Sequence, residues 1–487
     1  MEGKKKVFSC IMVCLAAFTQ GTMFLWNSFS LPYIEKEPFI VENDNNMREG
    51  NLTMDISEDN HTVNISEHHS GLIASAHSIG AAIGAICCGS VLSIGPLNIV
   101  LPLLSFAVVL SWALMVHASS LSMLVAGKLL LGLSVTLQCS QVPLYIAQVA
   151  PTKHRGLLLS SFSIIRNLSQ IIVTASAELL PLSWRMMTYL FGVVPAGLLA
   201  LVGPGLSKVE DVDTNMKNDA DSIAYGIMNV TNFSTWFNSL LICQKHPVLG
   251  KCISLITNSV DNIAEISKLP QKKQELERNY GSAKVSTAKQ KNWSIIKSTL
   301  FLMFFASSYI LSGMVLITNF PSKLFTPAYP YKPLIAMSLS LLSNLIGSMF
   351  SSFLTNKFGL RMVLMFSSTM MALCMSCLSI FYHFNMCTAN NYLMCYFPLI
   401  IIIIFFVSLA IGIGTIFIVI IGEKLPLKKR SLTMPVIMVT MEILEAVQNF
   451  ILPLLISYFD KIGLTVIFGG HAVANLASVL VAFLWIE

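Results

Sequence analysis

Twelve stretches of about 20 mostly apolar residues run through the sequence and constrain its fold more than any other feature. A helix needs about 20 such residues to cross a bilayer. The runs are continuous rather than alternating, which excludes a transmembrane β-barrel. The sequence therefore predicts an all-α membrane protein with 12 transmembrane helices, at about residues 8–31, 70–93, 97–117, 121–149, 156–178, 184–204, 298–320, 334–355, 362–385, 396–422, 432–457 and 463–485.

The composition excludes most other classes of protein. Of the 487 residues only 11% are charged, against about 25% in an average soluble domain. A soluble enzyme, a disordered chain and a disulfide-stapled secreted module are all excluded. The sequence contains no Walker loop, GxSxG, HExxH or paired CxxC motif. We therefore expect no enzyme activity, no catalytic residue, no metal and no cofactor. The net charge of +6 indicates orientation in the membrane rather than a nucleic-acid partner.

Two independent signals predict that both termini are cytoplasmic. The short loops then carry eleven basic residues inside and six outside, which is the bias expected for cytoplasmic loops. The loop at 35–70 holds nine acidic and two basic residues. It also carries three glycosylation sequons, at Asn51, Asn60 and Asn64, and glycans are added to such sites in secreted or extracellular segments. We expect 35–70 to be a glycosylated extracellular loop.

The chain divides into two similar halves. We predict an N-terminal six-helix half at 1–205, a cytoplasmic connector at 206–297 and a C-terminal six-helix half at 298–487. The same spacing recurs after the fourth span of each half, as Gln148-x-x-Pro151-x-x-x-Arg155 and Glu423-x-x-Pro426-x-x-x-Arg430. Parallel six-helix repeats are typical of the major facilitator fold, in which the substrate lies near the midplane and the halves rock to expose it.

One segment carries a family resemblance. Gly127-Lys128, Val142 to Pro151 and Arg155-Gly156 together resemble the GR…VPxYxxExxP…RG signature of the sugar porter family. The likeness covers nearly the whole chain, and it is greatest to insect facilitated trehalose and glucose transporters. It implies a transporter whose charged residues at helix ends gate the transport cycle. The matching positions here are Lys128, Gln148, Arg155, Asn356, Arg361, Glu423 and Arg430. Three of them depart from the family pattern, because Lys128 replaces an arginine, Gln148 a glutamate and Asn356 an acid.

The candidate substrate site combines matches to the family with new polar groups. Asn344 matches a family sugar contact, and Ser163 stands in place of the fifth-span glutamine. The glutamines and asparagine of the family's seventh span are replaced by the segment 306–312. Polar residues also recur on one face of the fifth span and of the eleventh. The predicted substrate-binding residues are Ser163, Arg166, Gln170, Ser307, Ser312, Asn344, Glu442 and Glu445.

Charges at mid-membrane need partners, because each costs at least about 2.5–3.5 kcal/mol. Arg166 with Glu442 or Glu445 is the expected pair across the halves. One interpretation is a cavity for a polar, charged or zwitterionic solute, and the other is a structural salt bridge. Since Gln20-Gly21-Thr22 stands where the family's first-span aspartate is expected, we favour facilitated diffusion over proton coupling.

The sequence as a whole predicts a plasma-membrane facilitator for a small polar solute, first of all a hexose or trehalose, acting as a monomer among membrane lipid. A transport-incompetent relative that acts as a receptor or binding protein is the alternative, and a transporter of a charged or zwitterionic organic solute is another. Cys387 and Cys395 flank a predicted extracellular loop, where a disulfide between them is permitted.

Overall fold

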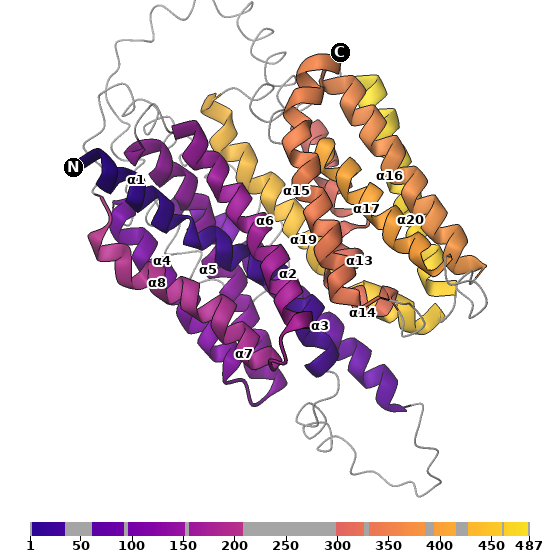
Figure 1. Ribbon diagram of the computed structural model, residues 1–487, viewed down its shortest axis with the longest axis horizontal. Coiled ribbons are helices and arrows are strands. Elements are labelled where there is room, and N and C mark those ends of the chain that lie inside the picture. Colours follow the sequence, from indigo (N-terminus) through magenta and orange to yellow (C-terminus); the bar gives the residue numbers. More distant parts are fainter. Residues whose placement is uncertain are drawn as a thin grey trace, which may run out of the picture. The chain divides into compact units, whose positions relative to one another are not determined.

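The computed structural model describes residues 2–34, 61–91, 96–150, 155–207, 299–325, 331–384, 394–414, 427–459 and 462–485. Within these ranges the regular structure is helical and holds no strand (Figure 1). One compact unit comprises Met1–Asp211, Phe304–Val419 and Ile437–Glu487. It contains parts of both predicted halves, so the contacts between halves described below lie within one unit.

The described helices follow the predicted spans closely. In the N-terminal half they are α1 (Glu2–Val13), α2 (Leu15–Ile34), α3 (His61–Val91), α4 (Leu97–Val116), α5 (Leu121–Val149), α6 (Arg155–Leu179), α7 (Trp184–Thr188), the π-helix η3 (Tyr189–Val193), α8 (Val194–Val202) and the 3₁₀ turn η4 (Gly203–Gly205). In the C-terminal half they are a helix at 299–310, α13 (Met314–Asn319), α14 (Pro321–Leu324), α15 (Pro333–Phe358), α16 (Leu360–His383), η7 (Met394–Tyr396), α17 (Phe397–Ile411), α19 (Leu427–Phe459) and α20 (Gly463–Trp485).

Eleven of the described helical segments are long and apolar enough to cross a membrane. The fifth predicted span is also a helix, α6, but it is not among these eleven. Two boundaries differ from the prediction. Helix α3 begins at His61 rather than near 70, so the helix extends beyond the apolar run into the predicted loop 35–70. Helix α17 ends at Ile411, and residues 415–422 of the predicted tenth span lie outside the described residues. Of the predicted connector 206–297, only Leu206 and Ser207 are described.

Glycine lets α3 and α5 pack with their backbones in contact. A Cβ atom at Gly80 would lie 2.0 Å from the carbonyl oxygen of Leu129, and one at Gly132 would lie 1.9 Å from that of His77. Small residues permit this close approach of helices in membranes, where van der Waals packing drives association. The contact fixes the position of α3 and of the polar side chains that it carries.

Two equivalent pairs of helices join the halves, and α2 also packs against α13 and α14. Helix α6 packs against α15, where the Ser338 hydroxyl donates to Thr174 Oγ1 over 2.8 Å. Helix α3 approaches α19 so closely that a Cβ at Gly71 would lie 2.7 Å from the Phe450 carbonyl oxygen. The first pair joins the fifth span to the eighth, and the second pair joins the second span to the eleventh. In a duplicated fold these two pairs are equivalent.

The seventh span is broken at its centre. Its helix ends near residue 310, Gly313 takes the left-handed conformation with φ of +104°, and α13 continues the span. Helix α20 satisfies the freed carbonyls: His471 Nδ1 donates to Leu311 (2.8 Å), and Asn475 Nδ2 donates to Ser312 (3.1 Å). A neighbouring helix thereby supplies the partners that bilayer lipid cannot.

We predict that Gly132→Ala destabilises the protein because the new methyl group would overlap the His77 carbonyl. Overpacking of this kind typically costs about 1–3 kcal/mol. The midpoint of thermal unfolding in detergent should fall. Gly470→Ala is the matched control, since nothing lies within 4 Å of the added Cβ. Equal midpoints for the two variants would contradict the described packing.

Candidate functional site

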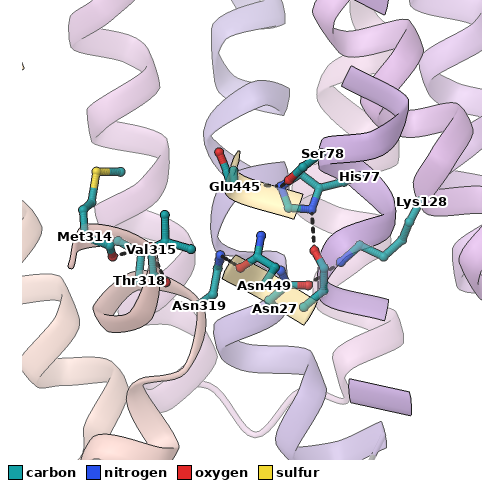
Figure 2. Close-up of polar contacts among 11 residues, drawn as sticks. Asn27, His77, Ser78, Lys128, Met314, Val315, Thr318, Asn319, Glu445 and Asn449 are labelled. Atoms are coloured by element: carbon teal, nitrogen blue, oxygen red, sulfur yellow. Dashed lines mark hydrogen bonds and ion pairs between the residues drawn. The ribbon is translucent and has the colours of Figure 1, made fainter. Parts of the chain in front are cut away.

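A group of buried polar side chains lies where the two halves approach each other (Figure 2). It draws on α2, α3 and α5 from the N-terminal half, and on α13 and α19 from the C-terminal half. Each member is at least 90% buried. We call this group the central polar cluster, and it consists of Asn27, His77, Lys128, Asn319, Glu445 and Asn449.

The cluster contains an acid–base pair that bridges the halves. Nε2 of His77, on α3, lies 3.3 Å from Oε1 of Glu445, on α19. The side chains are only 1% and 11% exposed. Nδ1 of His77 is 2.9 Å from the Ala74 carbonyl oxygen, and the Ser78 hydroxyl is 3.3 Å from Nε2. Both ring nitrogens therefore have partners, which holds the ring facing α19.

Lys128 is buried with neutral partners. Its ammonium group donates to Oδ1 of Asn27 and lies 4.5 Å from the centre of the Trp26 ring. The residue is 1% exposed, and among the described residues no carboxylate lies within ion-pairing distance of it. An amide oxygen and an aromatic face compensate part of the desolvation cost of a buried ammonium. Nδ2 of Asn27 is buried without a described hydrogen-bond partner.

Two asparagines on the C-terminal half complete the cluster. Nδ2 of Asn319, the last residue of α13, donates to Oδ1 of Asn449 on α19 over 2.7 Å. This bond leaves Oδ1 of Asn319 and Nδ2 of Asn449 buried without described partners. One free acceptor and one free donor therefore remain on adjacent amides. Buried polar atoms of this kind call for a partner outside the protein, such as water or a ligand.

The structure gives Glu445 a different partner from the one that the sequence predicted. Glu445 pairs with His77, and among the described residues no ion pair joins Arg166 to Glu442 or to Glu445. Arg166 is half-buried on α6, a helix that packs against α2 and α15. The predicted cross-half pair is therefore wrong in its basic member, although its acid is correctly placed at the junction. Tyr309 lies within electrostatic range of both Arg166 and Glu445.

The other predicted substrate-binding residues lie on the expected helices. Gln170, Ser307, Asn344 and Glu442 are half-buried. Ser312 is fully buried, and its hydroxyl donates to the Tyr309 carbonyl at the break in the seventh span. The side chain of Ser163 is outside the described part of α6. A role in substrate binding remains a prediction for all of these residues.

Most of the predicted gating residues lie beyond what the structure describes. The side chains of Gln148, Arg155, Asn356 and Arg430 are not described, although their helices are, and Glu423 lies outside the described residues. Arg361 is described, and it donates to the Phe483 carbonyl over 2.6 Å. This bond ties the start of α16 to the end of α20, within the C-terminal half.

The predicted extracellular sites are described only in part. Asn51, Asn60 and Cys387 lie outside the described residues, and the side chain of Asn64, on α3, is not described. Cys395 is disulfide-bonded and buried, and its carbonyl accepts a hydrogen bond from the Tyr331 hydroxyl.

Sequence reasoning missed His77, Asn27 and Asn319. A signal for His77 was present, since an ionisable residue inside an apolar span is a functional candidate by default. Asn27 and Asn319 lie near the ends of their spans, where polar residues are common. Only the fold shows that they face the same junction.

We predict that Asn27→Leu destabilises the protein by about 1–3 kcal/mol, the usual cost of leaving a buried polar group without its partner. The substitution removes the acceptor of the buried Lys128 side-chain nitrogen. The double variant Asn27→Leu/Lys128→Met should lose less stability than the two single variants combined, because it removes both polar partners together. Thermal unfolding of the four proteins in detergent measures this coupling. Additive losses would show that the two residues do not interact.

Known proteins resemble this chain in fold and, over shorter stretches, in sequence. The crystal structure of a D-xylose–proton symporter matches with a TM-score of 0.68 and 13% identity, covering 99% of this chain and 98% of that one. The xylose transporter XylE from E. coli, in a partially occluded inward-open conformation, matches with a TM-score of 0.65, 13% identity and the same coverage. This likeness confirms the predicted all-α major facilitator fold.

Among curated proteins, sugar transport protein MST4 of Oryza sativa subsp. japonica is 34% identical over 88 residues, which is 17% of each chain. The plastidic glucose transporter 4 of Arabidopsis thaliana is 37% identical over 89 residues, 17% of this chain and 16% of that protein. The matched stretch thus spans less than a fifth of these relatives. The model of the family described as "sugar (and other) transporter" matches residues 10–206 and 251–485. The chain belongs to this family, whose members are multi-pass membrane transporters and not enzymes.

Proposed function

We propose that this protein carries a small polar solute, first of all a sugar such as a hexose or trehalose, across the membrane. Transport proceeds by facilitated diffusion with alternating access. Family membership and the xylose-transporter-like fold support the class of activity. The choice of a sugar rests on the chemistry of the central polar cluster.

The observation that carries the proposal is the set of free amide atoms in the cluster. Asn27 and Asn449 each offer a buried Nδ2 donor, and Asn319 offers a buried Oδ1 acceptor. A sugar hydroxyl both donates and accepts, so it needs partners of both kinds. Sites built in this way discriminate strongly, because a ligand without the hydroxyl leaves their polar atoms unpaired.

Alternating access is supported by the kind of contact between the halves. Between α6 and α15 the polar contacts are the Thr174–Ser338 hydrogen bond and a 3.2 Å ion pair between Glu178 and Lys332. Both lie toward the ends of these helices that we predict to be extracellular. Contacts of this kind can break and reform without unfolding either half.

We predict that the purified protein in proteoliposomes takes up labelled glucose or trehalose above the rate of empty vesicles. Asn449→Ala should lower the rate at low sugar concentration roughly 2- to 10-fold, because one neutral hydrogen bond is worth about 0.5–1.5 kcal/mol. Asn319→Ala should act in the same direction. Asn98→Ala, in the first turn of α4 and outside the cluster, is the matched control. An equal loss in the control would remove the cluster from the site.

The same uptake measurements, together with sugar binding, distinguish the two alternative functions. Sugar binding without uptake or counterflow would identify a receptor or binding protein. The charged groups Arg166 and Lys128 favour the second alternative, a charged or zwitterionic solute. In that case uptake of an organic ion would fail in Arg166→Ala while glucose and trehalose remain untransported by every variant.

We further propose that the protein resides in the plasma membrane with both termini in the cytoplasm. The basic bias of the predicted inner loops and the three sequons in 35–70 support this orientation. We predict that glycosidase treatment of cell-surface protein increases its mobility on a gel, and that Asn51, Asn60 and Asn64 changed together to Gln abolish this shift. A shift that persists in the triple variant would place the glycans elsewhere.

A further inference from the structure

We propose that three side chains outside the central polar cluster set the sugar affinity of the site by holding α13 in place. They are Tyr382 on α16, in the ninth span, and His471 and Asn475 on α20, in the twelfth. They act as positioning residues, because α13 ends at Asn319, an amide of the cluster. The proposal rests on the proposed function for the role of that amide, and it gives two further spans a part in binding.

The position of α13 has to come from its neighbours. The helix has six residues, and the break at Gly313 separates it from the first part of the seventh span. Glycine takes left-handed and right-handed conformations about equally well, so Gly313 alone does not fix the direction in which α13 leaves the break. Helix α14, which follows, has only four residues.

Two side chains of α20 hold the start of this segment. Nδ1 of His471 donates to the Leu311 carbonyl over 2.8 Å, and Nδ2 of Asn475 donates to the Ser312 carbonyl over 3.1 Å. His471 and Asn475 are 7% and 0% exposed, and Nε2 of the one and Oδ1 of the other have no described partner. Burying polar atoms in a span is costly. The bonds to the two carbonyls are what offsets that cost.

Helix α16 holds the far end of the segment. The Tyr382 hydroxyl donates to the carbonyl of Leu324, the last residue of α14, over 3.0 Å. Helices α16 and α20 pack against each other along their length. The Tyr382 ring stacks on Phe468 with 5.4 Å between ring centres, and the Ser379 hydroxyl donates to the Thr465 carbonyl over 2.8 Å. The two helices therefore hold both ends of α13–α14 as one support.

Asn319 lies between these two held ends. Its Nδ2 is 2.7 Å from Oδ1 of Asn449 on α19, and its free Oδ1 faces the same buried cluster (Figure 2). Hydrogen bonds of this kind reach only to about 3.2 Å. A shift of α13 by about 1 Å would therefore break the Asn319–Asn449 bond and misplace the free acceptor for a sugar hydroxyl. The hydrogen bonds at the two ends of the segment are what prevents such a shift.

The chain offers closely matched variants. Tyr382→Phe removes only the hydroxyl that bonds α14. Ser379→Ala, one turn earlier on α16, also removes one hydroxyl that bonds a carbonyl, but that carbonyl belongs to α20. His471→Leu removes the donor to the break. His471→Asn is the conservative variant, since it places an amide nitrogen where Nδ1 lies. Asn475→Ala should act as His471→Leu does.

The first measurement is uptake of labelled glucose or trehalose by proteoliposomes over a range of concentrations. We expect Tyr382→Phe and His471→Leu to raise KM roughly 2- to 10-fold, the range for loss of one neutral hydrogen bond. The maximal rate per folded protein should change less. His471→Asn and Ser379→Ala should keep the wild-type KM. In an Asn319→Ala background neither Tyr382→Phe nor His471→Leu should raise KM further, because both act through Asn319.

A second measurement does not depend on transport. Thermal unfolding in detergent compares the loss caused by Asn449→Ala in different backgrounds. That loss should be smaller in Tyr382→Phe and in His471→Leu than in wild type, because the bond to Asn319 is already weakened there. In Ser379→Ala it should equal the wild-type loss. If His471→Leu does not fold, Tyr382→Phe decides, since it removes a single oxygen atom.

The outcomes separate this proposal from the proposed function. Wild-type uptake with an unchanged KM in Tyr382→Phe and His471→Leu would overturn the positioning role and leave sugar transport standing. Additive losses of stability in every background would also overturn it. A KM that rises equally in Ser379→Ala would show a general loosening of α16 and α20 instead. Absence of uptake by the wild type, with the expected non-additive losses, would count against sugar transport and support the hold on α13.

Discussion

The bilayer core offers no water to polar groups, and the rest of the structure depends on how the chain meets that constraint. An unpartnered backbone group in hydrocarbon costs several kcal/mol. The seventh span shows the consequence directly. It breaks at Gly313, and the carbonyls of Leu311 and Ser312 then bond to His471 and Asn475 of α20. A helix can therefore be interrupted near the centre of the protein only because a particular neighbour carries matching side chains.

The same constraint gathers the ionisable side chains of the spans at the junction of the halves. His77 has a carboxylate and a carbonyl as partners, whereas Lys128 has a neutral amide and an aromatic ring. Both residues therefore find their partners inside the protein, from helices that belong to different spans.

The sequence predicted the helices well and their partners poorly. The bounds of α5 agree with the predicted span 121–149, although Lys128 and Gln138 interrupt its apolar residues. The start of α3 was missed, because residues 61–69 are mostly polar and hydropathy does not reveal a polar extension of an apolar helix. Glu445 was placed correctly at the junction, but Arg166 was chosen as its partner. That choice depends on which helix faces α19, and hydropathy along one chain carries no information about neighbours. Glycine contacts between α3 and α5, which orient His77, are equally invisible without the fold.

The polar contacts that join α6 to α15 across the halves are individually weak, as a carrier requires. Exposed ion pairs such as Glu178–Lys332 are typically worth about 0.2–1 kcal/mol, and a neutral hydrogen bond such as Thr174–Ser338 about 0.5–1.5 kcal/mol. Their sum is a few kcal/mol, which is the range in which a minor conformation stays populated enough to be used. Were the junction instead sealed by a large apolar interface, a bound sugar would not shift the balance enough to open it.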